Sequence, residues 1–181
     1  MSHNLGAAKR LRKELQNLER QARKKRQSTS ASTTRSSADI DDDVYLRPTN
    51  ASSSILQWTA LLRGPSETPY EDGVFQLSIR CSTDYPLTPP TITFVTPIFH
   101  PNVHFASGDI CLDILKKEWS PAWGLQAACR AVLALLSECN ADSPLNCDAG
   151  NMVRNGDLGA FWGTARMYTA ENAMLLEWPD S

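Results

Sequence analysis

The sequence predicts an α+β fold in which one helix precedes a four-stranded antiparallel sheet and further helices follow it. Three observations support this order. The first segment has an apolar stripe of helical period, four short runs of β-branched and aromatic residues follow, and the last third has helical patterns bounded by helix-breaking residues. Short turns rich in proline and glycine separate the strand-like runs, which favours a meander.

The first helix is expected at residues 7–26. Its apolar residues recur at helical spacing and form one stripe: Leu11, Leu15, Leu18 and Ala22. The rest of its surface is charged, which is typical of a solvated helix that docks through its stripe and equally of a helix that binds a partner. Residues 27–43 are rich in Ser and Thr and end in three Asp. We therefore expect a flexible insertion there, within a single domain of residues 1–181.

Four strands follow, because β-branched and aromatic residues favour extended chain. They are expected at residues 44–46, 55–62, 74–79 and 91–95. The first should end before Pro48. Residues 98–122 show no regular pattern, and an irregular stretch of this length inside a compact domain is usually functional.

Three helical patterns complete the chain. The first, at residues 125–136, is apolar on nearly all sides, which predicts a central helix. Two more helices are expected near residues 147–155 and 158–175. No apolar run approaches the ~20 residues that cross a bilayer, so no direct membrane span is expected.

The charge is distributed unevenly along the chain. Residues 1–26 hold nine Lys or Arg and two Glu, a net charge of +7, whereas residues 27–181 hold nine basic and eighteen acidic residues, a net charge of −9. A basic segment on an acidic body suits a nucleic acid, an acidic membrane or an acidic protein partner.

Cysteine usage predicts free thiols in a reducing compartment. The five cysteines are odd in number and no pair has Cys-x-x-Cys spacing, so no zinc or other metal site is expected. Four of them are expected to be small packing residues: Cys81, Cys129, Cys139 and Cys147.

The irregular stretch carries the candidate chemistry. His100-Pro101-Asn102 is followed, nine residues after Asn102, by Cys111. A thiolate is a strong nucleophile, and a side-chain amide can donate a hydrogen bond to an oxyanion. Together they predict acyl transfer through a thioester. His100 and His104 leave a Cys/His hydrolase open, although no third group that would orient an imidazole is visible, and a buried thiol is the alternative to a catalytic one.

Several runs of this sequence resemble the ubiquitin-conjugating enzymes, in the same order and over most of the chain. They are KRLRKEL, QWTALLRGPSETPYEDGVFQLSI, DYPLTPPTITFVTPIFHPNV, GDICLDILKKEWSPAWGL and DSPLNCDAGNMVRNGD. The resemblance implies the same α+β fold. It also implies that Cys111 takes ubiquitin from the activating enzyme as a thioester, and that Asn102 stabilises the oxyanion or orders the loop. By the same resemblance His100 and Pro101 shape the loop, and His104 is a surface residue.

Further roles are carried over from the same family. Asp142 and Ser143 stand where the family has an acidic or serine gate beside the thiol, although a turn or cap role is the alternative for Asp142. The resemblance assigns a RING-type ligase to Pro86, Leu87, Ser120, Pro121 and Ala122. It assigns the activating enzyme to Lys9, Arg10 and Lys13. It implies no cofactor, since the activating enzyme consumes the ATP, and it explains the basic segment without a nucleic acid.

The runs GPSETPYEDGVFQL, CRAVLALL and DSPLNCDAGNMVRNGD followed by ARMYT most resemble the peroxisomal branch of the family. This implies a cytoplasmic protein that is peripheral on the cytosolic face of the peroxisomal membrane and tethered by a membrane-anchored peroxin. It also implies that ubiquitin goes to the peroxisomal import receptor for its recycling. The alternatives are general cytosolic ubiquitination, conjugation of another ubiquitin-like protein, and an inactive ubiquitin-binding variant, which would lack Cys111.

Overall fold

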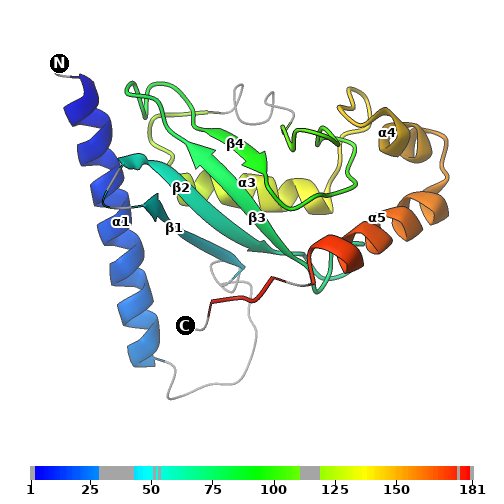
Figure 1. Cartoon of the computed structure of the whole chain (residues 1–181), viewed down its shortest axis with the longest axis horizontal. Coiled ribbons are helices and arrows are strands. Elements are labelled where there is room, and N and C mark those ends of the chain that lie inside the picture. Colours follow the sequence, from blue (N-terminus) through cyan, green and yellow to red (C-terminus); the bar gives the residue numbers. More distant parts are fainter. Residues whose placement is uncertain are drawn as a thin grey trace.

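The computed structural model describes residues 3–28, 43–50, 52, 54–110, 119–174 and 176–179. Its elements are α1 (His3–Ser28), β1 (Val44–Asn50), β2 (Ser54–Arg63), β3 (Val74–Arg80), β4 (Thr91–Phe94), α3 (Leu125–Ser137), α4 (Cys147–Arg154) and α5 (Leu158–Asn172). The predicted α+β order is confirmed (Figure 1). The insertion predicted at residues 27–43 lies largely outside the described residues, but residues 27 and 28 are the last of α1.

The four strands form one antiparallel sheet in the order β1-β2-β3-β4, so the predicted meander is confirmed. The first strand continues through Pro48 to Asn50 instead of ending before the proline. Because β1 is an edge strand, the missing N–H of Pro48 can face away from the ladder, and the proline is tolerated opposite Trp58.

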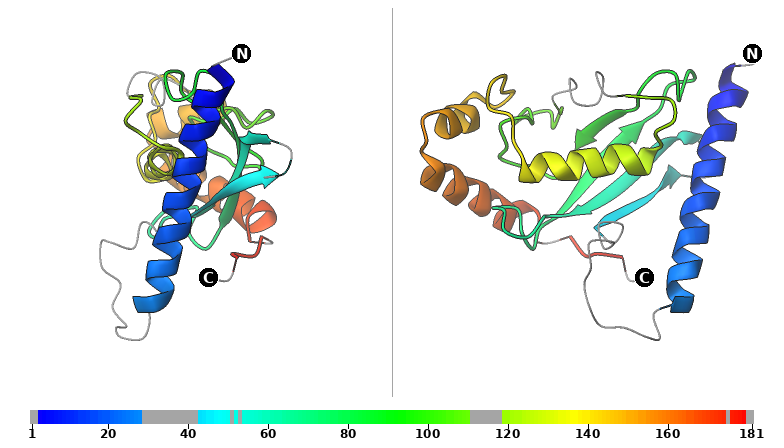
Figure 2. Two further views of the ribbon diagram at one scale, coloured as in Figure 1. Left: turned by 90° about the vertical axis from the view of Figure 1, so that its left-hand side faces the viewer. Right: turned by 180° about the vertical axis from the view of Figure 1, so that it is seen from behind.

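The core lies between the sheet and α3, which crosses one face of it (Figure 2). Period-two alternation sends Phe75, Leu77 and Ile79 of β3 inward, and none of the three is exposed. They belong to the same buried cluster as the apolar face of α3, whose buried residues are Leu125, Ala128, Cys129, Val132, Leu133, Leu135 and Leu136. Burying one such large apolar side chain contributes about 1.5–3 kcal/mol.

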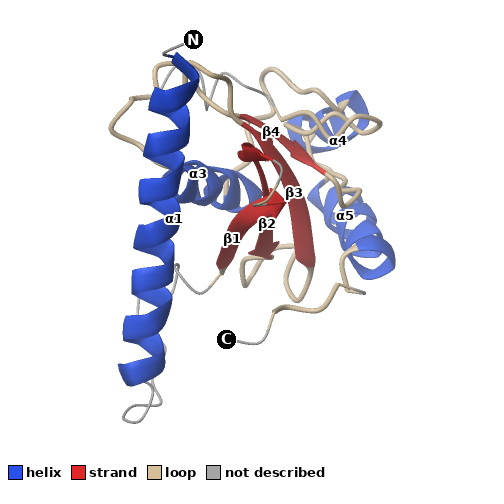
Figure 3. Cartoon of the chain, turned by 60° about the vertical axis from the view of Figure 1, so that its left-hand side comes forward, coloured by secondary structure: helices blue, strands red, loops and turns tan. Residues whose placement is uncertain are grey.

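Helix α1 lies against the sheet along only part of its length, as Figure 3 shows. Its Ala7 and Leu11 are buried, whereas Leu15 and Leu18 are half-buried. Ala22, the last residue of the predicted stripe, is exposed because the helix runs beyond the sheet.

The thiols outside the candidate active site differ in burial. Cys81 and Cys129 are buried and Cys139 is half-buried, as expected of packing residues. The packing prediction is wrong for Cys147, which is exposed as the first residue of α4. Among the described residues, no helix is both long and apolar enough to cross a membrane.

Candidate active site

The loop that follows β4 is buried from Ile98 to Val103. Ile98, Phe99 and Val103 are buried, and the hydroxyl of Tyr70 donates a 2.9 Å hydrogen bond to the carbonyl of Phe99. The aromatic ring of Tyr70 lies 5.7 Å from that of His100. The predicted active-site loop is therefore held in place by its contacts with the core.

His100 is fully buried and both of its ring nitrogens are engaged. Its Nε2 lies 3.0 Å from the carbonyl oxygen of Leu135, which can only accept, so Nε2 carries the proton. Its Nδ1 accepts a 3.0 Å hydrogen bond from the backbone N–H of Asn102. Burial lowers the pKa of His100 to about 4, against a smaller opposing effect of the Leu135 carbonyl, so the ring is neutral at pH 7.

The side chain of Asn102 pairs with the backbone of Asn140, just beyond α3. Its Nδ2 donates to the Asn140 carbonyl at 2.6 Å, and its Oδ1 accepts the Asn140 N–H at 2.8 Å. Asn102 is only 2% exposed. This reciprocal pair clamps the active-site loop to the segment that carries the predicted gate.

The gate segment is attached to the same loop a second time. The carbonyl of Pro101 accepts from the backbone N–H groups of Leu145 at 2.8 Å and Asn146 at 3.1 Å. Between these attachments lie Asp142 and Ser143, both exposed. The backbone N–H of Asp142 donates to Oδ1 of Asn140 at 2.9 Å, so the segment is folded into a defined turn.

The loop closes on itself before the predicted nucleophile. Val103 and Ile110 form an isolated antiparallel bridge, so the residue after Asn102 lies opposite the residue before Cys111. Gly108 makes this return possible, because it has a φ of 71° and a Cβ there would lie 2.0 Å from the carbonyl oxygen of Phe94. Cys111 itself lies outside the described residues.

The residues predicted to bind a ligase come from two loops that touch. Pro86 is half-buried and Leu87 is 77% exposed, whereas Pro121 and Ala122 are exposed in the other loop beside the half-buried Ser120. The indole Nε1 of Trp119 donates to the Pro86 carbonyl at 2.8 Å and joins the two loops.

The three cations predicted to bind the activating enzyme all lie on α1 but differ in their contacts. Lys9 and Lys13 are exposed on α1. Arg10 instead turns inward, with its Nε 2.7 Å from Glu14 and an Nη 2.7 Å from the carbonyl oxygen of Trp123. His104 is exposed, and its Nδ1 accepts a 3.1 Å hydrogen bond from the N–H of Ser107.

Two residues with central contacts were not predicted from the sequence. Asn140 pairs with Asn102 through its backbone, which leaves no side-chain signal for that contact, and Glu14 was counted only as a charge in the first helix. In the part of the chain that the structure describes, no cluster of His, Cys, Asp or Glu suited to a metal ion is found.

Comparison with known proteins identifies the class to which this fold and loop belong. The family model described as "Ubiquitin-conjugating enzyme" matches residues 10–168. The chain belongs to the ubiquitin-conjugating enzyme family, and it is therefore a transferase of the ubiquitin conjugation pathway.

Its relatives point to the peroxisomal type of that enzyme. Over 137 residues, 76% of this chain and 85% of the relative, it is 56% identical to Protein PEROXIN-4 of Arabidopsis thaliana. It is also 56% identical to the ubiquitin-conjugating enzyme E2 pex4 of Dictyostelium discoideum, over 71% of this chain and 85% of that one. A structure of H. polymorpha Pex4p in complex with the soluble domain of Pex22p matches with a TM-score of 0.76 and 33% identity, covering 92% and 98% of the two chains.

Proposed function

We propose that this protein accepts ubiquitin as a thioester on Cys111 and passes it, with a RING-type ligase, to the peroxisomal import receptor for its recycling. The observation that supports this most is the clamped loop that leads to Cys111. Ile110, which directly precedes Cys111 in the sequence, is paired with Val103, which directly follows Asn102.

The chemistry is two successive acyl transfers. The Cys111 thiolate attacks the thioester carbonyl between ubiquitin and the activating enzyme, and the thiolate of that enzyme leaves. An acceptor nucleophile then attacks the new thioester, and the Cys111 thiolate leaves. Each attack places negative charge on the carbonyl oxygen, which a nearby amide donor stabilises.

Asn102 is proposed to order the loop during these steps. One N–H of its amide is directed to the Asn140 carbonyl and its oxygen is directed to the Asn140 N–H. An amide nitrogen has a second N–H, so a direct contact with the oxyanion is compatible with this pair. The gate residues Asp142 and Ser143 are proposed to orient the acceptor, because they are exposed on the segment that the pair holds against the loop.

A Cys/His hydrolase finds less support. A general base needs an imidazole nitrogen free to take a proton near pH 7. The two nitrogens of His100 are directed to Leu135 and Asn102, and its pKa of about 4 is far below that range. We therefore propose a structural role for His100 and Pro101.

The partners and the location are proposed from the relatives. A relative whose structure was determined with the soluble domain of Pex22p supports a membrane-anchored peroxin as the tether. Relatives named as peroxins support a peripheral location on the cytosolic face of the peroxisomal membrane. Lys9 and Lys13 are proposed to contact the activating enzyme, and the loops of Leu87 and Pro121 are proposed to contact the ligase.

The test of the carrier role is incubation with activating enzyme, ATP and ubiquitin. A reductant-sensitive adduct is expected in the wild-type protein and in Cys147→Ala, which removes an exposed thiol of α4, but not in Cys111→Ala. An unmodified wild-type protein, or an adduct that survives in Cys111→Ala, contradicts the proposal.

Asn102→Asp separates the two roles of Asn102. The variant keeps an acceptor for the Asn140 N–H but turns a carboxylate oxygen toward the Asn140 carbonyl, which costs about 2 kcal/mol of unfolding free energy. Loop ordering predicts that this loss accompanies a slower discharge of the thioester, by roughly 100-fold, because a misplaced reacting group loses about that factor. Slower discharge with unchanged stability indicates a contact with the oxyanion alone.

A further inference from the structure

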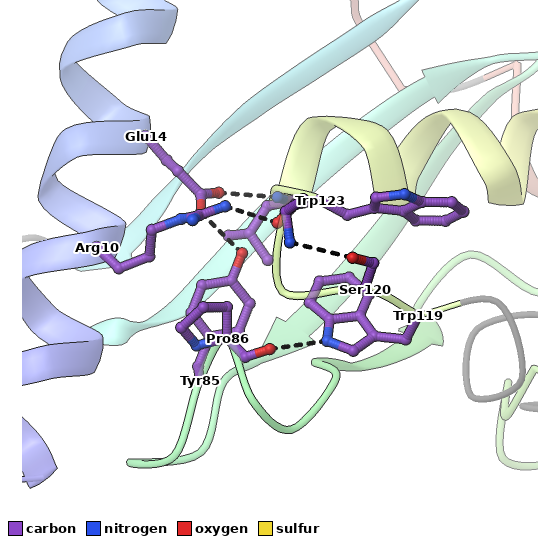
Figure 4. Close-up of polar contacts among 9 residues, drawn as sticks. Arg10, Glu14, Tyr85, Pro86, Trp119, Ser120 and Trp123 are labelled. Atoms are coloured by element: carbon purple, nitrogen blue, oxygen red, sulfur yellow. Dashed lines mark hydrogen bonds and ion pairs between the residues drawn. The ribbon is translucent and has the colours of Figure 1, made fainter.

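Glu14 of α1 receives hydrogen bonds from three parts of the chain (Figure 4). Its Oε1 accepts from Nε of Arg10 at 2.7 Å and from the hydroxyl of Tyr85 at 2.8 Å. Its Oε2 accepts from the backbone N–H of Leu125 at 2.8 Å. The Glu14 side chain is only 14% exposed, so these contacts lie largely out of water.

Arg10 and Glu14 also contact the loop before α3 at two further residues, Trp123 and Gly124. Arg10 donates through an Nη to the carbonyl of Trp123 at 2.7 Å. A Cβ on Gly124 would lie 2.9 Å from Oε2 of Glu14, so only glycine leaves the carboxylate its place. Glu14 and Arg10 therefore fix the chain from Trp123 to Leu125 against α1.

Both loops that meet at Glu14 carry proposed ligase contacts. Tyr85 directly precedes Pro86 and Leu87. Trp123 follows Ser120–Ala122, and its N–H donates to the Ser120 carbonyl at 2.8 Å. The loops also touch each other, since the rings of Tyr85 and Trp119 lie 5.9 Å apart and Trp119 bonds to the Pro86 carbonyl.

We propose that Glu14 is a positioning residue for ligase binding. From its place on α1, its side chain sets the distance and angle between the two loops. This rests on the proposed function, in which these loops bind the RING-type ligase. Leu87 is 77% exposed and has little packing to hold it, so its position follows from Tyr85 and Pro86 behind it. Arg10, whose side chain is 31% exposed, takes part in this support through Glu14 and the Trp123 carbonyl.

Helix α1 itself does not depend on Glu14 in the same way. It is docked by Ala7 and Leu11, which are 1% and 0% exposed. Lys9 and Lys13 point outward on that docked helix. Loss of the Glu14 charge is therefore expected to displace the two loops while α1 stays in place.

The test is Glu14→Gln, with Glu19→Gln as the matched control. Both remove one negative charge from α1, but Glu19 is exposed, whereas Glu14 is largely buried. A Gln has one acceptor oxygen where Glu14 faces three donor groups, so the contacts cannot all be kept. Hydrogen exchange of residues 84–88 and 120–125 is expected to accelerate in Glu14→Gln and to stay unchanged in Glu19→Gln.

The second measurement is discharge of the charged protein at increasing concentrations of a purified peroxisomal RING domain. The half-saturating concentration is expected to rise roughly tenfold in Glu14→Gln, because contacts to a partly buried charge contribute about that factor or more. The maximal rate and the ligase-free formation of the thioester should stay within about twofold of wild type, which loss of folding would not allow.

The outcomes separate this inference from the proposed function. If the wild-type protein forms no thioester, or its discharge is not stimulated by the RING domain, the proposed function fails, and the exchange experiment still tests the positioning. Unchanged exchange in both loops of Glu14→Gln overturns the inference. So does an unchanged half-saturating concentration in a wild-type system that responds to the RING domain.

Discussion

Two regions of this protein are held by polar contacts of opposite kinds. The active-site loop is fixed by neutral groups, namely the buried imidazole of His100 and the amide of Asn102, each paired with backbone. The loops that carry the proposed ligase contacts are fixed by a charge, because the carboxylate of Glu14 is shared among Arg10, Tyr85 and the N–H of Leu125.

The difference follows from burial. His100 and Asn102 are 0% and 2% exposed, and a charge in such a place carries a high desolvation cost. Glu14 is 14% exposed and Arg10 is 31% exposed, so both charges keep some contact with water and stabilise each other. The neutral clamp, formed by His100 and Asn102 with their backbone partners, suits a loop that must keep one shape through a reaction. A charge at the border of helix and loop suits a surface that meets partners.

The largest effect is expected from His100→Ala in the neutral clamp. The change opens a cavity and leaves the Leu135 carbonyl and the Asn102 N–H without partners, so the unfolding free energy should fall by about 4 kcal/mol. Denaturant unfolding measures this loss. His104→Ala, which removes an exposed imidazole, should change it by less than about 0.5 kcal/mol. Similar losses in the two variants would show that His100 does not clamp the loop.

The next effect is the response of the neutral clamp to acid. His100 has a folded-state pKa of about 4 against an ordinary value of 6.5, so between these values the unfolded chain binds a proton that the folded protein excludes. The stability contributed by neutral His100 is complete above pH 6.5 and falls as the pH drops toward 4, by about 3 kcal/mol in total.

Unfolding at several pH values in wild type and His100→Gln isolates that response. Carboxylates titrate in the same range in both proteins, so only the difference between the two curves belongs to His100. That difference should shrink between pH 6.5 and 4. If the unfolding free energies of the two proteins ran parallel against pH, the buried ring of His100 would take up its proton without cost. The neutral clamp would then not depend on the neutral form of His100.

The smallest effect is expected from Tyr85→Phe at the charged site. The ring stays buried, but Glu14 loses one of its donors, so the unfolding free energy should fall by about 1–2 kcal/mol. Combined with Glu14→Gln, the losses should be less than additive, because both variants remove the same contact. Fully additive losses would indicate that Tyr85 and Glu14 act independently.

The sequence predicted most of the fold because its elements depend on local patterns. The alternation in β3 and the apolar run of α3 each show which side is buried. The end of β1 was misplaced, because the pattern around Pro48 does not show that the strand lies at the edge of the sheet. The exposure of Cys147 was missed for a similar reason, since a small residue at the start of a helix packs or not according to its neighbours.

The candidate site was predictable only where a side chain signals its role. His100, Asn102 and Cys111 stand out as residue types with known chemistry. Glu14 does not, because its partners lie 71 and 111 residues away and no spacing in the sequence joins them. Arg10 was assigned to a partner surface by family resemblance, which does not show that its side chain also bonds to Glu14.

The bridge between Val103 and Ile110 holds two residues side by side whatever the length of the turn between them. The turn that it closes has an exposed tip at His104, Phe105 and Ala106. Insertions at such a tip are generally tolerated, and a longer tip would leave the paired ends where they are. A sequence search that demands the cysteine nine residues after the asparagine would then overlook enzymes with the same geometry, whereas a search for the paired ends would find them.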